Sequence, residues 1–101
     1  MEFDWDEYKN LINIKNHEGI SFEDATKVFD DDWSIEDYDE SHSADEQRFS
    51  VIGLADFTLL RVVFTYREVE SGNQIIRIIS AWKATSKDKE TYEKARNEFD
   101  I

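Results

Sequence analysis

The sequence lacks the residues on which many catalytic and structural centres depend. It contains no cysteine, no proline and only two histidines among its 101 residues. The absence of cysteine excludes a disulfide framework, a thiol nucleophile and cysteine-based zinc or iron–sulfur sites. Two histidines are too few for a histidine-rich metal centre, and neither a glycine-rich phosphate loop nor a nucleophile elbow is present. We therefore expect a protein without a metal or cofactor.

Long apolar runs are also missing. No segment approaches the roughly 20 apolar residues of a membrane-spanning helix. The first ten residues are acidic, with no apolar run like that of a secretory signal. These features predict a soluble cytoplasmic protein that does not enter a membrane. A chain of 101 residues can form one domain with one core, so residues 1–101 are expected to be a single domain.

Positive charge is scarce and unevenly placed. The chain has 24 acidic against 12 basic residues, a net charge of −12. Residues 1–47 hold 16 acidic and 3 basic residues, giving −13, whereas residues 48–101 hold 8 and 9, giving +1. Any surface that binds nucleic acid must therefore be local and must draw on the second half. Residues 30–46 contain nine acids and no lysine or arginine, which is typical either of a solvated surface or of a docking surface for a basic partner.

The apolar periodicity predicts an α+β domain. Two helices are expected over residues 4–18 and from residue 21, and a third from residue 85 or 86. A short strand at residues 33–38 and three strands at 48–55, 58–67 and 74–81 form an antiparallel sheet of about four strands, with 74–81 as the central strand. A further short strand at residues 2–5 is an alternative. Segregated helices on an antiparallel sheet define the α+β class.

The same periodicity predicts which side chains face the core. The first helix should begin at an N-cap formed by Asp4, with Glu7 at the capping-box position. Alternation makes Arg77 emerge from an apolar strand in a fixed direction. The expected core-facing residues are Tyr8, Leu11 and Ile12 on the first helix; Phe22, Ala25, Val28 and Phe29 on the second; Leu60, Val62, Phe64 and Tyr66 on strand 58–67; Ile76, Ile78 and Ser80 on strand 74–81; and Tyr92, Ala95 and Phe99 on the last helix.

The remaining candidates for chemistry are scattered histidine, arginine and lysine residues: His17, His42, Arg48, Arg61, Arg77 and Lys83. Such side chains can cleave RNA without a metal. A base removes the proton of a 2′-hydroxyl, which attacks the adjacent phosphate, and an acid protonates the departing 5′-oxygen. Fixed cations stabilise the extra charge of the transition state. The same residues can instead pair with the many carboxylates or, for His17, interact with a helix C-terminus.

Three segments, in this order, resemble the BrnT toxin family. They are FDWDEYKNLINIKNHEGISFEDATKVFDD at residues 3–31, DESHSADEQRFSVIG at 39–53 and RIISAWKATSKDKETYE at 77–93. The most specific pieces are Asn13 with His17 before SFEDA, the block around His42 and Arg48, and the run from Arg77 to Thr85. The resemblance implies a compact RelE-like ribonuclease fold and RNA cleavage without a metal. By position it assigns His17, His42, Arg48, Arg77 and Lys83 to catalysis, whereas Arg61 is added from strand geometry.

The resemblance also implies partners. Members of the family are typically encoded beside a BrnA-type antitoxin with a ribbon–helix–helix DNA-binding domain. The antitoxin neutralises the toxin, and the complex represses its own operon, so the toxin reaches DNA only through that complex.

Two positions depart from the family pattern. Asn16-His17-Glu18 stands where the family commonly has Lys-His-Gly, and Trp82 stands where it commonly has arginine. Both changes remove positive charge. Trp82 can stack on a base or pack against the last helix. Two of the functional interpretations follow from the resemblance: a metal-independent endoribonuclease that inhibits translation, or a catalytically weak relative that binds proteins in antitoxin-dependent autoregulation. An unrelated acidic domain that mimics nucleic acid is a third.

Overall fold

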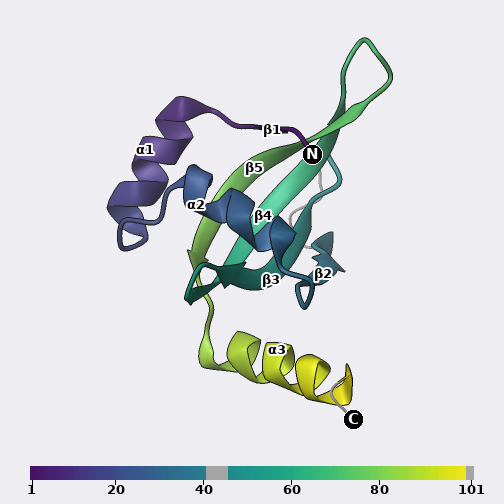
Figure 1. The fold of residues 1–101 in the computed structure, drawn as a ribbon. Coiled ribbons are helices and arrows are strands. Elements are labelled where there is room, and N and C mark those ends of the chain that lie inside the picture. Colours follow the sequence, from purple (N-terminus) through teal and green to yellow (C-terminus); the bar gives the residue numbers. More distant parts are fainter. Residues whose placement is uncertain (41–45, 100–101) are drawn as a thin grey trace.

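The computed structural model describes residues 1–40 and 46–99. Its elements, in chain order, are β1 (Phe3–Asp4), α1 (Glu7–Asn16), α2 (Phe22–Thr26), the 3-10 helix η1 (Lys27–Asp30), β2 (Ile35–Tyr38), β3 (Phe49–Ala55), β4 (Thr58–Glu68), β5 (Gln74–Lys83) and α3 (Ser86–Phe99) (Figure 1). The α+β class is confirmed. No helix within the described residues is long and apolar enough to span a membrane.

The strands form one sheet in the order β1-β5-β4-β3-β2. Every neighbouring pair is antiparallel except β1 and β5, which run parallel, so the sheet is mixed and has five strands instead of about four antiparallel ones. The alternative strand at the N-terminus is thus present. The central strand is β4 rather than β5, but β1 still pairs with β5 at Arg77, which leaves that residue flanked on both sides.

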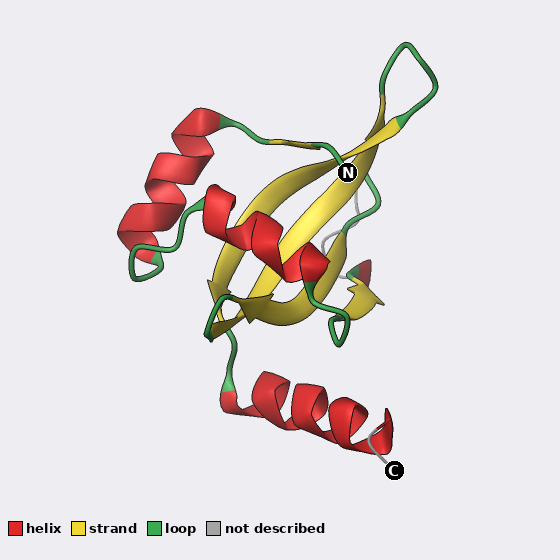
Figure 2. Cartoon of the chain, in the orientation of Figure 1, coloured by secondary structure: helices red, strands yellow, loops and turns green. Residues whose placement is uncertain are grey.

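The core lies between one sheet face and the α2–η1 segment, which crosses the sheet in Figures 1 and 2. Phe22 and Phe64 are fully buried there, each worth about 1.5–3 kcal/mol of burial free energy. Gly53 permits the close approach of η1, because a Cβ atom at this position would lie 3.1 Å from the Val28 carbonyl oxygen. The expected core residues of the second helix and of the central strand are confirmed, except that Tyr66 is 40% exposed at the strand end.

A β-bulge changes the face assignment near the end of β5. Val63 pairs with Ser80 and Phe64 pairs with Ile78, so Ile79 is the extra residue of the bulge. The insertion reverses the alternation beyond it. Ala81 therefore lies fully buried in the core, and the prediction that Ser80 continues the face of Ile76 and Ile78 is wrong.

Helix α1 packs differently from its predicted orientation. Its N-cap is Asp6, not Asp4, because the Asp6 carboxylate accepts a hydrogen bond from the Lys9 N–H. The predicted core-facing residues Tyr8, Leu11 and Ile12 are 72%, 59% and 40% exposed, whereas Asn10 and Asn13 are buried.

The Asn13 side chain explains this orientation. Its amide donates to the Ala81 carbonyl at 2.9 Å, and its oxygen accepts the Ala81 N–H at 3.1 Å. Asn13 therefore supplies the two hydrogen bonds that a neighbouring strand would make. These bonds satisfy the edge of β5 beyond the end of β1.

Helix α3 lies beyond the end of β5 (Figure 1) and is attached through two polar contacts. Tyr92 donates its hydroxyl to Asp31 at 2.8 Å, and Asp88 pairs with Arg61 of β4. Asp31 also accepts the N–H groups of Trp33 and Leu54, so this member of the acidic run is a structural residue and not a solvated charge. Tyr92 is buried and Ala95 half-buried, as expected for the core stripe, and the Phe99 side chain lies outside the described part.

Candidate functional site

The sheet face opposite α2 carries most of the candidate residues. We call it the open face, and define it by Ser50, Arg61, Thr65, Arg77 and Trp82. Alternation places these side chains away from the core residues Val51, Leu60, Phe64 and Ile76. Three strands thus bring residues distant in sequence onto one surface.

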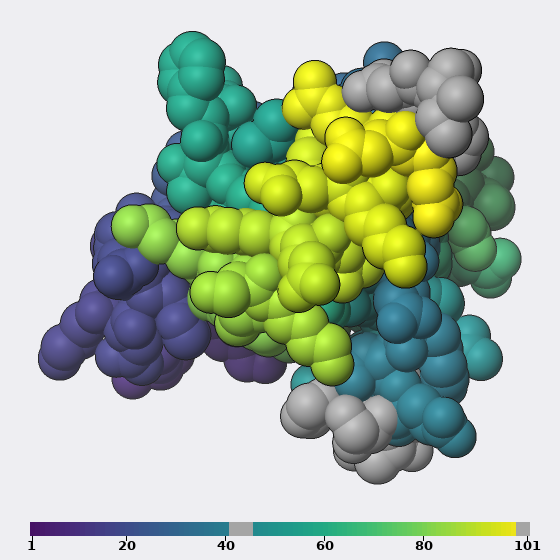
Figure 3. Space-filling view, turned by 90° about the horizontal axis from the view of Figure 1, so that it is seen from below, coloured from purple at the N-terminus to yellow at the C-terminus, as the bar shows by residue number. Residues whose placement is uncertain are grey.

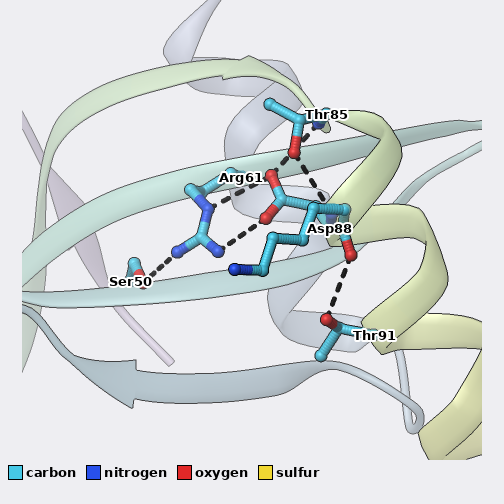
Figure 4. Close-up of polar contacts among 6 residues, drawn as sticks. Ser50, Arg61, Thr85, Asp88 and Thr91 are labelled. Atoms are coloured by element: carbon cyan, nitrogen blue, oxygen red, sulfur yellow. Dashed lines mark hydrogen bonds and ion pairs between the residues drawn. The ribbon is translucent and has the colours of Figure 1, made fainter.

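Arg61 is held firmly at the corner where α3 begins (Figure 4). Its guanidinium donates to Asp88 Oδ1 at 2.7 Å, to Asp88 Oδ2 at 3.3 Å and to Ser50 Oγ at 2.6 Å. The paired hydrogen bonds raise the pKa of Arg61 and lower the pKa of Asp88. Asp88 also accepts the Thr85 N–H at 3.1 Å, so one carboxylate both caps α3 and binds the sheet.

Trp82 lies directly opposite Arg61 across the β4–β5 pair. With Ser50, Asp37, Asp39 and other residues, they line a shallow pocket of about 260 Å³. His17, at the C-terminus of α1, places its ring 6.1 Å from the Trp82 ring, with 38° between the planes. The Trp82 ring therefore lies beside His17, and it is only half-buried.

Arg77 lies about 13 Å from Arg61 along the strands, since its partner Thr65 is four residues further along β4. Its NH1 atom is 3.2 Å from Asp4 Oδ1, and Arg67 NH1 is 3.6 Å from Asp4 Oδ2. Asp4 Oδ1 is shielded from solvent and accepts no hydrogen bond, so its contact with Arg77 is electrostatic. One carboxylate thus lies between two arginines of the open face.

The other candidates are placed less centrally. Arg48 precedes β3, and its Nε atom is 3.5 Å from Glu46 Oε1. Lys83 pairs in register with the core residue Leu60, so it points away from the open face, and its ammonium is 3.3 Å from Glu18 Oε2. His42 lies outside the described residues. The structure therefore brings together Arg61, Trp82 and His17. Further along the strands of the open face lie Arg48 and Arg77, and Lys83 points away from that face.

Five of the candidate residues lie in the described part of the chain, and the four lysine and arginine residues among them share one property. Arg48, Arg61, Arg77 and Lys83 each pair with a carboxylate of the same chain. The Arg48–Glu46 and Lys83–Glu18 pairs are partly exposed and weak, because solvent screens them, whereas the Arg77–Asp4 pair is half-buried. The Arg61–Asp88 pair is bidentate and Asp88 is only 7% exposed, so it is not readily displaced. An incoming phosphate would have to compete with these carboxylates.

Sequence reasoning missed the acidic partners. The sequence predicts a helix cap at Asp4 and gives no sign that Asp4 or Asp88 pairs with an arginine. The T-x-x-D spacing of Thr85 and Asp88 predicts a helix cap but gives no sign of the arginine 27 residues earlier. Ser50 gave no signal beyond its place in the alternation. Within the described residues, no group of three or more histidine, cysteine or acidic side chains is arranged to hold a metal ion.

The elements of this surface fall within a region shared with a known family. A sequence model described as the ribonuclease toxin BrnT of type II toxin–antitoxin systems matches residues 5–88. This chain belongs to the BrnT family. No curated protein matches the chain significantly. The BrnT match runs from Trp5 through Asp88 and so includes α1, four of the strands and the first residues of α3. A BrnT ribonuclease toxin of a type II system has an antitoxin as its partner.

Proposed function

We propose that this BrnT chain is a metal-independent endoribonuclease that acts in the cytoplasm and inhibits translation by cutting RNA. The observation that carries the proposal is the open face, which gathers Arg61, Arg77 and Trp82, with His17 at its edge and Arg48 at the start of β3. Cations and an imidazole can carry out metal-free cleavage, and a partly accessible aromatic ring can stack on a base of single-stranded RNA.

The proposed reaction is an attack of the 2′-hydroxyl on the adjacent phosphate. A base takes the hydroxyl proton, the new O–P bond forms as the P–O5′ bond breaks, and an acid protonates the 5′-oxygen. His17 and His42 supply the two proton-transfer roles in this scheme. Arg77 and Arg48 stabilise the phosphate charge in the transition state. Because His17 lies beside Trp82 and Arg61, about 13 Å along the strands from Arg77, the scheme requires RNA binding to bring His17 and Arg77 to the same phosphate. Arg61 fixes the floor of the site through Ser50.

The remaining assignments concern RNA binding. Trp82 is half-buried, so one part of its ring is accessible and can stack on a base. Lys83 contacts a phosphate at the end of β5, because its exposed pair with Glu18 is weak enough to yield to RNA. The partner in this proposal is a BrnA-type antitoxin with a ribbon–helix–helix domain, and DNA is bound only through that complex.

A second function is favoured by one specific observation. Each of the four candidate arginine and lysine residues is already paired with a carboxylate of the chain. A site neutralised in this way suits a catalytically weak toxin that is retained to bind the antitoxin and repress the operon. The two functions predict opposite results in one experiment.

The experiment is induced expression with and without the adjacent antitoxin gene, scored for growth and for RNA integrity. The endoribonuclease proposal predicts growth arrest and RNA fragments with toxin alone, and rescue by the antitoxin. The Arg77→Ala variant, expressed at the same level, should abolish both effects. Normal growth and intact RNA with toxin alone would favour the binding function.

A further inference from the structure

A groove between α3 and the tip of the β3–β4 hairpin is not used by the open face. It has a volume of about 490 Å³. Leu54, Leu59 and Ala84 form its apolar floor, with Phe57 at one side. Figure 3 shows α3 lying across this side of the molecule, with the hairpin tip projecting beside it. Its size and its apolar floor are those of a binding site for side chains of a partner.

Phe57 is the most exposed large apolar residue in the described part of the chain. It is 100% exposed, although it follows Asp56 in a two-residue turn where nothing about the turn requires an aromatic side chain. The turn is also anchored: Lys27 Nζ lies 2.7 Å from Asp56 Oδ2, which ties the hairpin tip to η1. An exposed aromatic ring on a short, tied turn is a typical anchor of protein interfaces.

The rim of the groove is basic in a strongly acidic protein. Lys83, Lys89 and Arg96 line it, against the single acid Glu93, although the whole chain carries a net charge of −12. Within the described residues, neither Lys89 nor Arg96 forms an ion pair within 4 Å, in contrast to the four candidate cations of the site, although Arg96 is close enough to Asp31 to lower the pKa of that carboxyl. An apolar floor with a basic rim is complementary to an amphipathic segment that carries carboxylates.

We propose that this groove binds an acidic amphipathic segment of the antitoxin, with an apolar side chain of that segment packed on Phe57 and its carboxylates facing Lys89 and Arg96. The inference rests on the proposed function, because it takes the neutralising antitoxin as the partner. RNA is the less suitable occupant, since its phosphates gain nothing from the apolar residues of the groove, whereas an amphipathic segment can pack on them. Because Lys83 borders the groove, an occupant also competes with RNA at the end of β5.

The exposed apolar face of α1, formed by Tyr8, Leu11 and Ile12, is the rival surface. It therefore supplies the matched control for an apolar substitution. Lys94, on the same helix as Lys89 but outside the groove lining, supplies the matched control for a charge reversal.

The test measures binding of the purified antitoxin encoded by the adjacent gene, together with RNA cleavage, for each variant. Phe57→Ser should weaken antitoxin binding about thirtyfold, as loss of an interface anchor does. The Lys89→Glu/Arg96→Glu double variant should slow association at low salt by about tenfold or more. Leu11→Ser and Lys94→Glu should bind within twofold of wild type. RNA cleavage should be unchanged in all four, because the altered side chains lie outside the open face, and thermal melts should be unchanged in the three single variants. Arg96→Glu also removes the attraction of Arg96 for Asp31, so the double variant is compared with wild type at a temperature where both are folded.

Four outcomes would overturn the inference. Antitoxin binding lost in Leu11→Ser but kept in Phe57→Ser would place the partner on α1. Tighter antitoxin binding by the Lys89→Glu/Arg96→Glu variant would mean that the occupant is basic. Lost RNA cleavage with normal antitoxin binding in the groove variants would assign the groove to RNA. A wild-type protein that binds antitoxin through Phe57 but cleaves no RNA would support the groove and reject the endoribonuclease proposal. A wild-type protein that cleaves RNA, together with unaltered antitoxin binding in Phe57→Ser, would support the endoribonuclease proposal and reject the groove.

Discussion

Removing the carboxylate between Arg67 and Arg77 should make the protein a better RNA-binding toxin. In Asp4→Asn, the backbone pairing of β1 with β5 is retained, but the 3.2 Å and 3.6 Å ion pairs are lost. Both pairs are partly exposed, and such pairs contribute about 0.5 kcal/mol each. RNA that no longer has to displace them should gain about 1 kcal/mol in total, which corresponds to about fivefold tighter binding.

The assay is single-turnover cleavage of a short RNA, with RNA affinity measured in parallel at two salt concentrations. Glu23→Gln is the control, because it makes the same change in net charge on α2, on the other side of the sheet. Asp4→Asn should bind more tightly than this control, and the difference should shrink at higher salt. Equal affinity and equal cleavage in the two variants would refute the idea that Asp4 neutralises an RNA-binding arginine.

Three further predictions concern stability and metal dependence. Asp88→Ala removes a bidentate arginine pair and a helix cap, so it should lower the free energy of unfolding by about 2–3 kcal/mol in urea titrations, and Asp88→Asn should lower it less. The pKa of Asp88 is lowered in the folded protein, so the stabilisation by Asp88 is present above about pH 4 and is lost as the pH falls further. Asp88→Asn should therefore flatten the acid limb of the curve of stability against pH. An unchanged acid limb in Asp88→Asn would contradict this prediction. Burial and the hydrogen bond to Asp31 raise the pKa of Tyr92 to about 12, so its contribution should be lost between about pH 10 and 12, and Tyr92→Phe should remove that part of the alkaline loss of stability. RNA cleavage should persist in excess EDTA, and activity that is abolished by chelation and restored by a divalent ion would contradict the metal-independent mechanism.

Much of the fold could be predicted because local signals agreed with tertiary packing. The β3–β4–β5 meander follows from alternating apolar residues, and α2 begins at the expected Ser21 cap. The α1 orientation could not be predicted from apolar spacing. Its packing is decided by the Asn13 side chain, which satisfies the exposed edge of β5 at Ala81, and this contact joins residues 68 positions apart. The bulge at Ile79 likewise depends on how two strands pair and not on either sequence alone.

The candidate site, like the fold, could be predicted only in part. Alternation along β4 correctly separates Arg61 from the core residues Leu60 and Val62. The sequence does not reveal that Asp4 and Asp88 pair with the arginines, because ion pairs between distant elements depend on the folded geometry. A strongly acidic chain offers many carboxylates for each arginine, and composition does not identify which of them is close. The groove beside Phe57 also had no sequence signal, because its walls come from a hairpin turn and from one side of α3.

The central claim is that Arg77 on the open face stabilises the charge of a transition-state phosphate. The most direct measurement is single-turnover cleavage of a short RNA by wild type, Arg77→Lys and Arg77→Ala. Arg67→Ala is the control, because Arg67 shares the Asp4 carboxylate but is more exposed. Lysine keeps the charge but loses the planar fork that binds two phosphate oxygens, so Arg77→Lys should cleave on the order of a hundredfold more slowly, and Arg77→Ala more slowly still. Arg67→Ala should lose less than tenfold, with melts and antitoxin binding kept in all variants. Normal cleavage by Arg77→Ala would contradict the account, and so would a wild-type protein that cuts neither free nor ribosome-bound RNA.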